Sequence, residues 1–188
     1  QFRHEANNPN SLPSGYVIDL CEDKEGYLWV LASQGDLARF NPATNRAETF
    51  RFQPQNEQNL SYSPSWCLHH NHLGQLWIGT DNGLDLFLPQ TKSFKRFLYD
   101  STHYRTQKGI QVLAIFTDAE GVLWVGTNRG LGKLDIKTGI FRKVQLIPNS
   151  KSEERIKTIY QDNNKTIWVG TATGGLFELL PDKKNFKS

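Results

Sequence analysis

The fold class is decided by residues 112–131, which read Val112-Leu-Ala-Ile-Phe-Thr-Asp118-Ala-Glu-Gly121-Val-Leu-Trp124-Val-Gly-Thr-Asn-Arg-Gly130-Leu131. Two runs rich in β-branched and aromatic residues, 112–117 and 122–127, flank a tight Asp-x-x-Gly turn. Runs of this composition, bounded by turn residues, predict short antiparallel strands. The pattern continues with a third strand at 131–136 and a fourth at 140–146. Helical periodicity is absent over any stretch of ten residues or more.

The same pattern occurs four times. Its tryptophans, which are 48, 47 and 44 residues apart, are Trp29, Trp77, Trp124 and Trp168. Each is preceded by Asp or Asn six residues earlier, and three of them are followed two residues later by Gly79, Gly126 or Gly170. Four strands in a period of about 45 residues predict an all-β protein of the β-propeller type, with one blade per period. We expect the tryptophans to fill the space between blades and the glycines to allow close approach.

A second column, a phenylalanine followed by a base, sets the expected limits of the blades. Its members are Phe2, Phe50, Phe94, Phe141 and Phe186. We therefore expect residues 1–15 to form the outer strand of a preceding blade plus a linker. The four blades are expected at 16–52, 64–98, 110–146 and 155–188. Four blades are the low limit for a closed ring, so the expectation is a segment of a propeller of about seven blades. Its open blade faces predict self-association, with two arcs completing an eight-bladed ring.

Composition excludes several functional classes. The 188 residues carry a net charge of only +3, far from the strongly basic balance of a nucleic-acid-binding domain. Apolar runs fall short of the roughly 18 residues that a membrane span needs, so we expect no direct membrane insertion. A start at Gln1 and the absence of Met indicate an excised or mature chain.

One face of the propeller is the expected ligand site. The turns between the first and second strands are short and regular, whereas the connections between blades are long and irregular, and binding usually occurs on such loops. Aromatic rings beside amides and charges suit a sugar or another polar ligand. The candidate residues on that face are Tyr16, Tyr62, Trp66, Asp81, Asn82, Tyr104, Arg105, Asn128 and Arg129.

No catalytic residues, metal ligands or cofactors are predicted. The cluster His69-His70-Asn71-His72 is not predicted to bind a metal. Alternation in a strand sends His69 and His70 to opposite faces, and the sequence has no Cys-x-x-Cys or His-Glu-x-x-His motif to complete a site. For a lyase, the one pair that the repeat allows is His70 with Glu22 of the adjacent blade. Cys21 and Cys67 lie at equivalent positions of two blades, so their side chains are expected to point the same way around the ring. Because a disulfide needs Cβ atoms that point toward each other, we expect two buried free thiols.

Two stretches, 18–29 and 112–131, resemble two-component-regulator propeller repeats, and Asn10-Ser-Leu12 and Asn59-Leu-Ser61 resemble the linker of that family. The sequence departs from the pattern at Leu31-Ala32, which replaces Gly-Thr, and at Lys165, which replaces the turn glycine. At the latter, we expect Asn164 to take the left-handed conformation.

The resemblance implies a periplasmic sensing domain of a membrane-bound histidine kinase or diguanylate cyclase. In the best-known branch of the family, the signal is a breakdown product of a polysaccharide. The leading hypothesis is thus a non-catalytic sensor fragment that binds a small extracytoplasmic ligand, such as an oligosaccharide. The alternatives are a propeller-type lyase and a purely structural interaction module.

Overall fold

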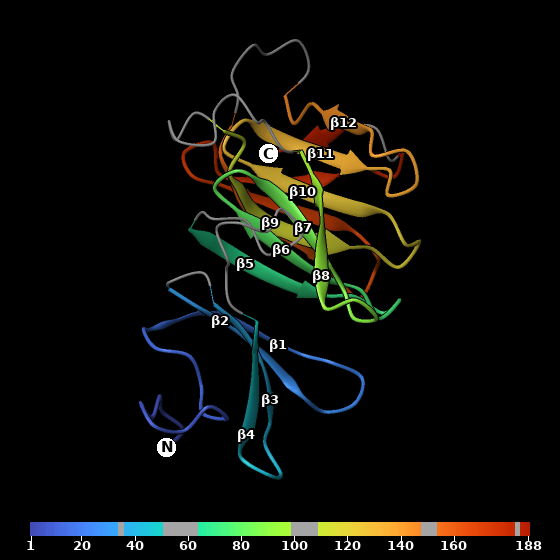
Figure 1. The fold of residues 1–188 in the computed structure, drawn as a ribbon. Helices are drawn as coiled ribbons and strands as arrows, with labels where there is room; N and C mark the ends of the chain where they lie inside the picture. Colours follow the sequence, from blue (N-terminus) through green and yellow to red (C-terminus); the bar gives the residue numbers. More distant parts are fainter. Residues whose placement is uncertain (34–35, 51–63, 99–108, 148–153, 183–184) are drawn as a thin grey trace.

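The computed structural model describes residues 1–33, 36–50, 64–98, 109–147, 154–182 and 185–188. These residues form four separate sheets, each of four antiparallel strands that follow one another along the chain (Figure 1). The all-β propeller architecture predicted from the repeat is confirmed. None of the described residues forms a helix long and apolar enough to cross a membrane.

The four sheets are called blades 1 to 4. Blade 1 contains β1 Val17–Glu22, β2 Leu28–Ala32, β3 Leu37–Asn41 and β4 Arg46–Phe50. Blade 2 contains β5 Ser65–His70, β6 Leu76–Thr80, β7 Gly83–Leu88 and β8 Ser93–Phe97. Blade 3 contains β9 Val112–Thr117, β10 Leu123–Thr127, β11 Gly130–Leu134 and β12 Phe141–Val144. Blade 4 contains β13 Ile156–Gln161, β14 Ile167–Thr171, β15 Leu176–Leu179 and β16 Phe186–Lys187.

The first hairpin of each blade is closed by a tight turn that needs a left-handed residue. In blade 3, Gly121 has φ 82° and donates its N–H to the carbonyl of Asp118 at 2.9 Å. In blade 4 this conformation is taken by Lys165, with φ 64°, so the expectation that Asn164 would adopt it is wrong. The last residue of the turn must adopt the left-handed conformation whatever its type, and at Lys165 this costs strain energy that a glycine would not incur.

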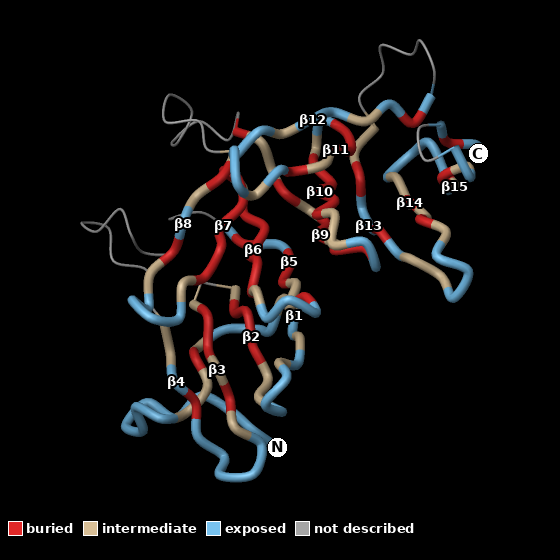
Figure 2. Tube along the Cα trace, turned by 90° about the vertical axis from the view of Figure 1, so that its right-hand side faces the viewer, coloured by how far each residue is buried: buried red, intermediate tan, exposed pale blue. Residues whose placement is uncertain are grey.

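The blades are stacked around a common axis as an open arc (Figure 2). The first strands β1, β5, β9 and β13 are neighbours in that order along the inner side. We call the side of each blade that carries Trp29, Trp77, Trp124 or Trp168 its Trp face, and the other side its back face. Trp77, fully buried, shares an apolar cluster with Val125 on the back face of blade 3. Trp124 meets Val169 of blade 4 in the same way.

A glycine on the Trp face receives the first residue of the next blade. A Cβ at Gly126 would lie 2.5 Å from Cγ2 of Ile156, and one at Gly79 would lie 2.6 Å from the carbonyl oxygen of Val112. Blade 1 has Leu31 at this position, and the first residue of blade 2 is the small Ser65; both are fully buried. At this junction the large residue is on the Trp face and the small one begins the next blade, the reverse of the other two junctions. This reversal explains why Leu31 replaces the glycine of the repeat.

Strand register revises the phenylalanine column. Phe94 pairs with Phe87, Phe141 with Leu134 and Phe186 with Leu179, and in blade 1 the same place is held by Ala47, opposite Phe40. Phe50 lies three residues further along and pairs with Leu37, as Phe97 pairs with Leu84. Phe50 thus belongs to a different column, on the Trp face. The limits of the blades as domains stay a prediction.

The N-terminal residues cover part of the back face of blade 1. The Phe2 ring lies 4.8 Å from that of Phe40, and the carbonyl of Asn10 accepts the N–H of Ala47 at 2.7 Å. The Phe2–Phe40 contact resembles the 5.0 Å contact that Phe50 makes with Phe87 across the next junction. Phe2 therefore occupies the place, relative to blade 1, that an outer-strand phenylalanine occupies relative to the blade after it.

Candidate functional site

The turns between β-strands two and three of each blade lie beside the segments that enter the blades, as the topology predicts. One backbone hydrogen bond recurs at this end: Asp81 N–H to Pro64 O at 2.9 Å, Asn128 N–H to Gln111 O at 3.0 Å, and Ala172 N–H to Arg155 O at 2.8 Å. A threonine hydroxyl also bonds across the turn: in blade 3, the Thr127 hydroxyl donates to the carbonyl of Gly130 at 2.9 Å. The candidate residues are thus carried on a backbone that repeated hydrogen bonds hold in place.

Three of the predicted residues come together across the junction of blades 2 and 3. The carboxylate oxygen Oδ1 of Asp81 accepts hydrogen bonds from Trp66 Nε1 at 2.6 Å and from Gln111 Nε2 at 2.8 Å. Asn128 Oδ1 accepts the backbone N–H of Gln111 at 3.1 Å. Trp66 remains 42% exposed, so a large aromatic surface lies beside the carboxylate. We call Trp66, Asp81, Gln111 and Asn128 the Asp81 cluster. Gln111 was not among the residues predicted from the sequence, where the one available signal was its position directly before β9.

Asn82 is next to this cluster but is not a surface residue. It is 7% exposed, and within the described residues both its amide nitrogen and its amide oxygen are buried without a hydrogen-bond partner. Gly109 passes so close that a Cβ there would lie 2.5 Å from Asn82 Oδ1. Considering the described residues alone, Asn82 is therefore a buried polar group with unsatisfied hydrogen-bonding atoms beneath the end of the blade.

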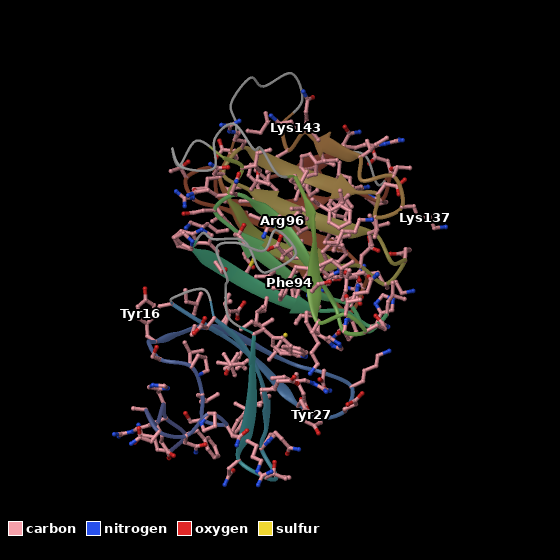
Figure 3. All side chains as sticks on the ribbon, viewed as in Figure 1. Tyr16, Tyr27, Phe94, Arg96, Lys137 and Lys143 are labelled. Carbon is pink, nitrogen blue, oxygen red and sulfur yellow. The ribbon has the colours of Figure 1, made fainter. Side chains whose placement is uncertain are left out.

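The remaining candidates are not part of this cluster. Tyr16, which directly precedes β1, is 73% exposed and projects from the side of the molecule (Figure 3). Arg129 is exposed, and its backbone N–H donates to the Thr127 hydroxyl at 3.0 Å. Tyr62, Tyr104 and Arg105 lie outside the described residues.

A cleft that sequence reasoning did not predict lies between blades 1 and 2, at the opposite end of the strands. Its volume is about 370 Å³. Trp29, Phe50 and Phe87 contribute its apolar surface, although Trp29 and Phe87 are only 5% and 7% exposed. The repeat gives no signal for it, because the residue opposite the tryptophan is charged in blades 1, 3 and 4 alike: Arg39, Lys133 and Glu178.

Ion pairs link the charges around this cleft. Arg39 lies 4.0 Å from the Tyr27 ring centroid and donates to Asp23 at 2.8 Å and to Glu25 at 2.7 Å. Burial opposes the charge of Arg39, but hydrogen bonds to Glu25 and Asp23 hold its pKa above the ordinary value. Burial likewise opposes the charge of Asp23, whose pKa is nevertheless lowered by the hydrogen bonds from Arg39 and from the backbone of Tyr27. Lys92 pairs with Glu48 on the other side.

His69 and His70 have different contacts and different surroundings. His69 Nε2 accepts the backbone N–H of Thr117 in blade 3 at 3.0 Å, and burial lowers the pKa of His69 to about 4. Burial also lowers the pKa of His70, and the carboxylate that opposes this shift is that of Asp23, not that of Glu22. In the described part of the chain, no group of three or more His, Cys, Asp or Glu residues is placed to hold a metal ion.

Both cysteines are free thiols. Cys67 is buried, whereas Cys21 is half-buried, so the prediction of two buried thiols holds for one of them. Burial raises the pKa of Cys21 to about 12 and raises that of Cys67 as well. Neither thiol therefore has the lowered pKa of a reactive cysteine.

Comparison with known proteins finds a family model that matches three segments of the chain. The profile described as "Two component regulator propeller" matches residues 11–34, 106–129 and 150–173. These three segments, 72 of the 188 residues, are two-component regulator propeller repeats. The three matches cover the first hairpins of blades 1, 3 and 4, and blade 2 shares their strand register.

Relatives of these propeller repeats occur in signalling proteins. A histidine kinase, P4 of Formosa agariphila, is 31% identical over 90 residues, which are 45% of this chain and 7% of that protein. The extracellular domain of the hybrid two component system BT3049 of B. thetaiotaomicron is 26% identical with a TM-score of 0.73, over 94% of this chain and 25% of that one. The corresponding domain of BT4673 from the same organism is 20% identical with a TM-score of 0.74, over 98% of this chain and 23% of that one. The chain thus spans about a quarter of the solved domains and a small part of the kinase.

Proposed function

We propose that this chain is part of the extracellular sensor region of a two-component regulator and that it binds a small polar ligand at the Asp81 cluster. The family of its repeats and the extracellular domains that they resemble support the sensor assignment. The observation that carries the ligand site is the bridge from Trp66 and Gln111 to one oxygen of Asp81, because it joins blades 2 and 3 at the loop-bearing end. A ligand that competes for this carboxylate alters a contact between two blades, and that change is the proposed signal.

An oligosaccharide fits the chemistry of the cluster best. The exposed Trp66 indole offers a flat surface for the apolar face of a sugar ring. The carboxylate of Asp81 and the amides of Gln111 and Asn128 are suitable partners for hydroxyl groups. The buried amide of Asn82 adds donors and an acceptor that a small movement of the turn would make available.

The cleft between blades 1 and 2 is less suited to this role. Its rings are almost fully buried, so they present little surface on which a sugar could stack. Arg39 is already paired with Asp23 and Glu25, and Lys92 with Glu48, so a ligand that used these charges would have to break those ion pairs. A lyase is also disfavoured, because the pair on which it would depend, His70 and Glu22, has no hydrogen bond among those that the described residues form.

Titration calorimetry of the chain against neutral and acidic oligosaccharides of three to eight units tests the proposal. We expect binding to at least one of them, weakened tenfold or more by Trp66→Ala or Asp81→Asn and unchanged by Leu73→Ser, an exposed residue on the opposite end of blade 2. Binding that resists both cluster variants but is lost in Arg39→Ala would move the site to the cleft. Turnover of any oligosaccharide would contradict the sensor assignment.

A further inference from the structure

Arg155 enters blade 4 at the position that Gln111 holds at the entry of blade 3. A repeated hydrogen bond fixes this equivalence: the carbonyl of Gln111 accepts the N–H of Asn128, and the carbonyl of Arg155 accepts the N–H of Ala172. From its position, the Gln111 side chain reaches back to the turn of blade 2 and donates to Asp81 at 2.8 Å. Arg155 therefore holds, at the junction of blades 3 and 4, the place from which Gln111 bridges blades 2 and 3.

The carboxylate that Gln111 meets is replaced by an amide at the junction of blades 3 and 4. Asn128 is the blade 3 equivalent of Asp81, since their backbone N–H groups make the same hydrogen bond to the segment that enters the blade. Asn128 Oδ1 already accepts the backbone N–H of Gln111, which leaves its Nδ2 group as a donor. The polar groups that the repeat places on the two sides of this junction, those of Asn128 and Arg155, are therefore both donors.

Arg155 is half-buried, and its Nε is fully buried without a hydrogen-bond partner among the described residues. The two other half-buried arginines in the described ranges have carboxylate partners, at 2.7 Å for Arg39 and Asp23 and at 3.5 Å for Arg96 and Asp85. A guanidinium that is withdrawn from water without an acceptor is costly. This junction therefore holds a positive group that lacks the acceptor its surroundings call for.

The neighbouring carboxylate of Glu154 does not supply that acceptor. Glu154 Oε2 accepts the Thr173 hydroxyl at 3.4 Å, and a Cβ at Gly174 would lie 2.8 Å from the same oxygen. Glu154 is thus directed to the turn of its own blade. Because blades 3 and 4 are both described, the missing acceptor does not result from where the sequence begins or ends.

We propose that Arg155 and Asn128 bind an anionic group, a carboxylate or a sulfate, on the oligosaccharide that lies at the Asp81 cluster. A guanidinium holds such a group through N–H donors of fixed geometry. The two sites are continuous, because Asn128 belongs to the Asp81 cluster. The ligand is then an acidic oligosaccharide, with hydroxyl groups at Asp81 and a negative charge one blade further along. The sugar in this inference rests on the proposed function, whereas the anion site rests on the burial of Arg155.

Nitrogen-15 NMR of the arginine side chains tests the anion site directly. The Nε–H signal of Arg155, identified by its loss in Arg155→Lys, should shift to saturation on titration with sodium glucuronate or sodium sulfate and should not respond to glucose. The two titrations separate a carboxylate from a sulfate. The Nε–H signal of Arg142, exposed on β12, is the control for general salt effects. The absence of a saturable shift with either anion, or an equal shift with chloride at the same ionic strength, would overturn the inference.

Calorimetry with matched oligosaccharides tests whether this anion belongs to the ligand. Each acidic oligosaccharide is compared with a neutral counterpart of equal length, such as an oligogalacturonate with its methyl ester. Arg155→Gln should weaken binding of the acidic form by about tenfold or more, since it removes a charged hydrogen bond. The same variant should leave both the binding of the neutral form and the free energy of unfolding unchanged. Arg142→Gln, which removes the same charge from an exposed position, should change none of these quantities.

The two experiments also separate failure of this inference from failure of the proposed function. Oligosaccharide binding that needs Asp81 but is indifferent to the ligand's charge and to Arg155→Gln would contradict the anion site and leave the proposed function intact. A saturable response of Arg155 to glucuronate without binding of any oligosaccharide would retain the anion site and contradict the sugar. A loss of stability in Arg155→Gln would show a structural role for the guanidinium and contradict the inference.

Discussion

Asp118 Oδ2 accepts a hydrogen bond of 2.8 Å from the indole nitrogen of Trp124, six residues later in the chain. Oδ1 of the same carboxylate accepts the N–H groups of Glu120 and Val122, at 3.1 and 2.8 Å. One side chain therefore closes the turn and satisfies the buried indole between blades 3 and 4. Asp162 does the same for Trp168, at 2.9 Å.

Removing this carboxylate should destabilise the protein. Asp118→Ala leaves the buried Trp124 N–H and two backbone N–H groups without acceptors, so we expect a loss of about 2–4 kcal/mol in the free energy of unfolding. Urea unfolding followed by tryptophan fluorescence measures it. Asp135→Ala is the control, because Asp135 Oδ1 also caps a turn, at Lys137 and Thr138, but bonds no indole. Equal losses in the two variants would contradict a role for the indole bond.

Blade 2 offers the converse experiment. Asn71 takes the place of the aspartate there, and the indole nitrogen of Trp77 is buried without a partner in the described structure. Asn71→Asp supplies an acceptor, while the Thr117 hydroxyl, which now receives a bond from Asn71, can donate instead. The Gln75 side-chain amide, whose oxygen now accepts from Asn71 at 2.9 Å, can rotate so that its nitrogen donates to the new carboxylate. We expect a gain of about 1 kcal/mol. The gain should disappear in a Trp77→Phe background, and a gain that persists there would have another cause.

The interblade bond of His69 makes stability depend on pH. Its pKa is lowered to about 4 in the folded state, so the folded protein favours the neutral ring, whose Nε2 accepts the Thr117 N–H. The contribution is complete above the unfolded pKa of about 6.5 and is lost as the pH falls from there towards 4. Unfolding of the wild type and of His69→Gln, whose amide oxygen can accept the same N–H without titrating, should be compared from pH 7.5 to 4. The difference between them should grow against the wild type below pH 6.5, and parallel curves would exclude this role.

The receiving glycines should differ in their tolerance of a methyl group. Gly126→Ala drives a Cβ into Ile156, and overpacking of a buried junction costs about 1–3 kcal/mol. Gly170→Ala meets only the end of the Thr158 side chain, so the 188-residue chain should lose less than about 0.5 kcal/mol. Thermal unfolding of the wild type and the two variants makes the comparison. A similar loss at both positions would indicate a backbone effect of glycine and not the junction.

The repeat predicted the strands well because turn residues and tryptophans are short-range signals. It misplaced Phe50, since Ala47 breaks the column and a phenylalanine three residues later continues it with nearly the same spacing. It also could not predict the burial of Asn82 or the cleft beside Arg39. Both arise where one blade meets another, and a period tells which residues are equivalent but not what faces them.

The exchanged sizes at Leu31 and Ser65 constrain how such a protein can lengthen by gene duplication. A tandem copy of blade 3 would set Gly126 against the valine of its own duplicate, a combination that the Gly79–Val112 junction already accommodates. A tandem copy of blade 1 would set Leu31 against Val17, two bulky side chains where each existing junction has at least one small partner. Blade 3 is thus a unit that can multiply without further mutation, whereas blade 1 is confined to a position before a blade that begins with a small residue.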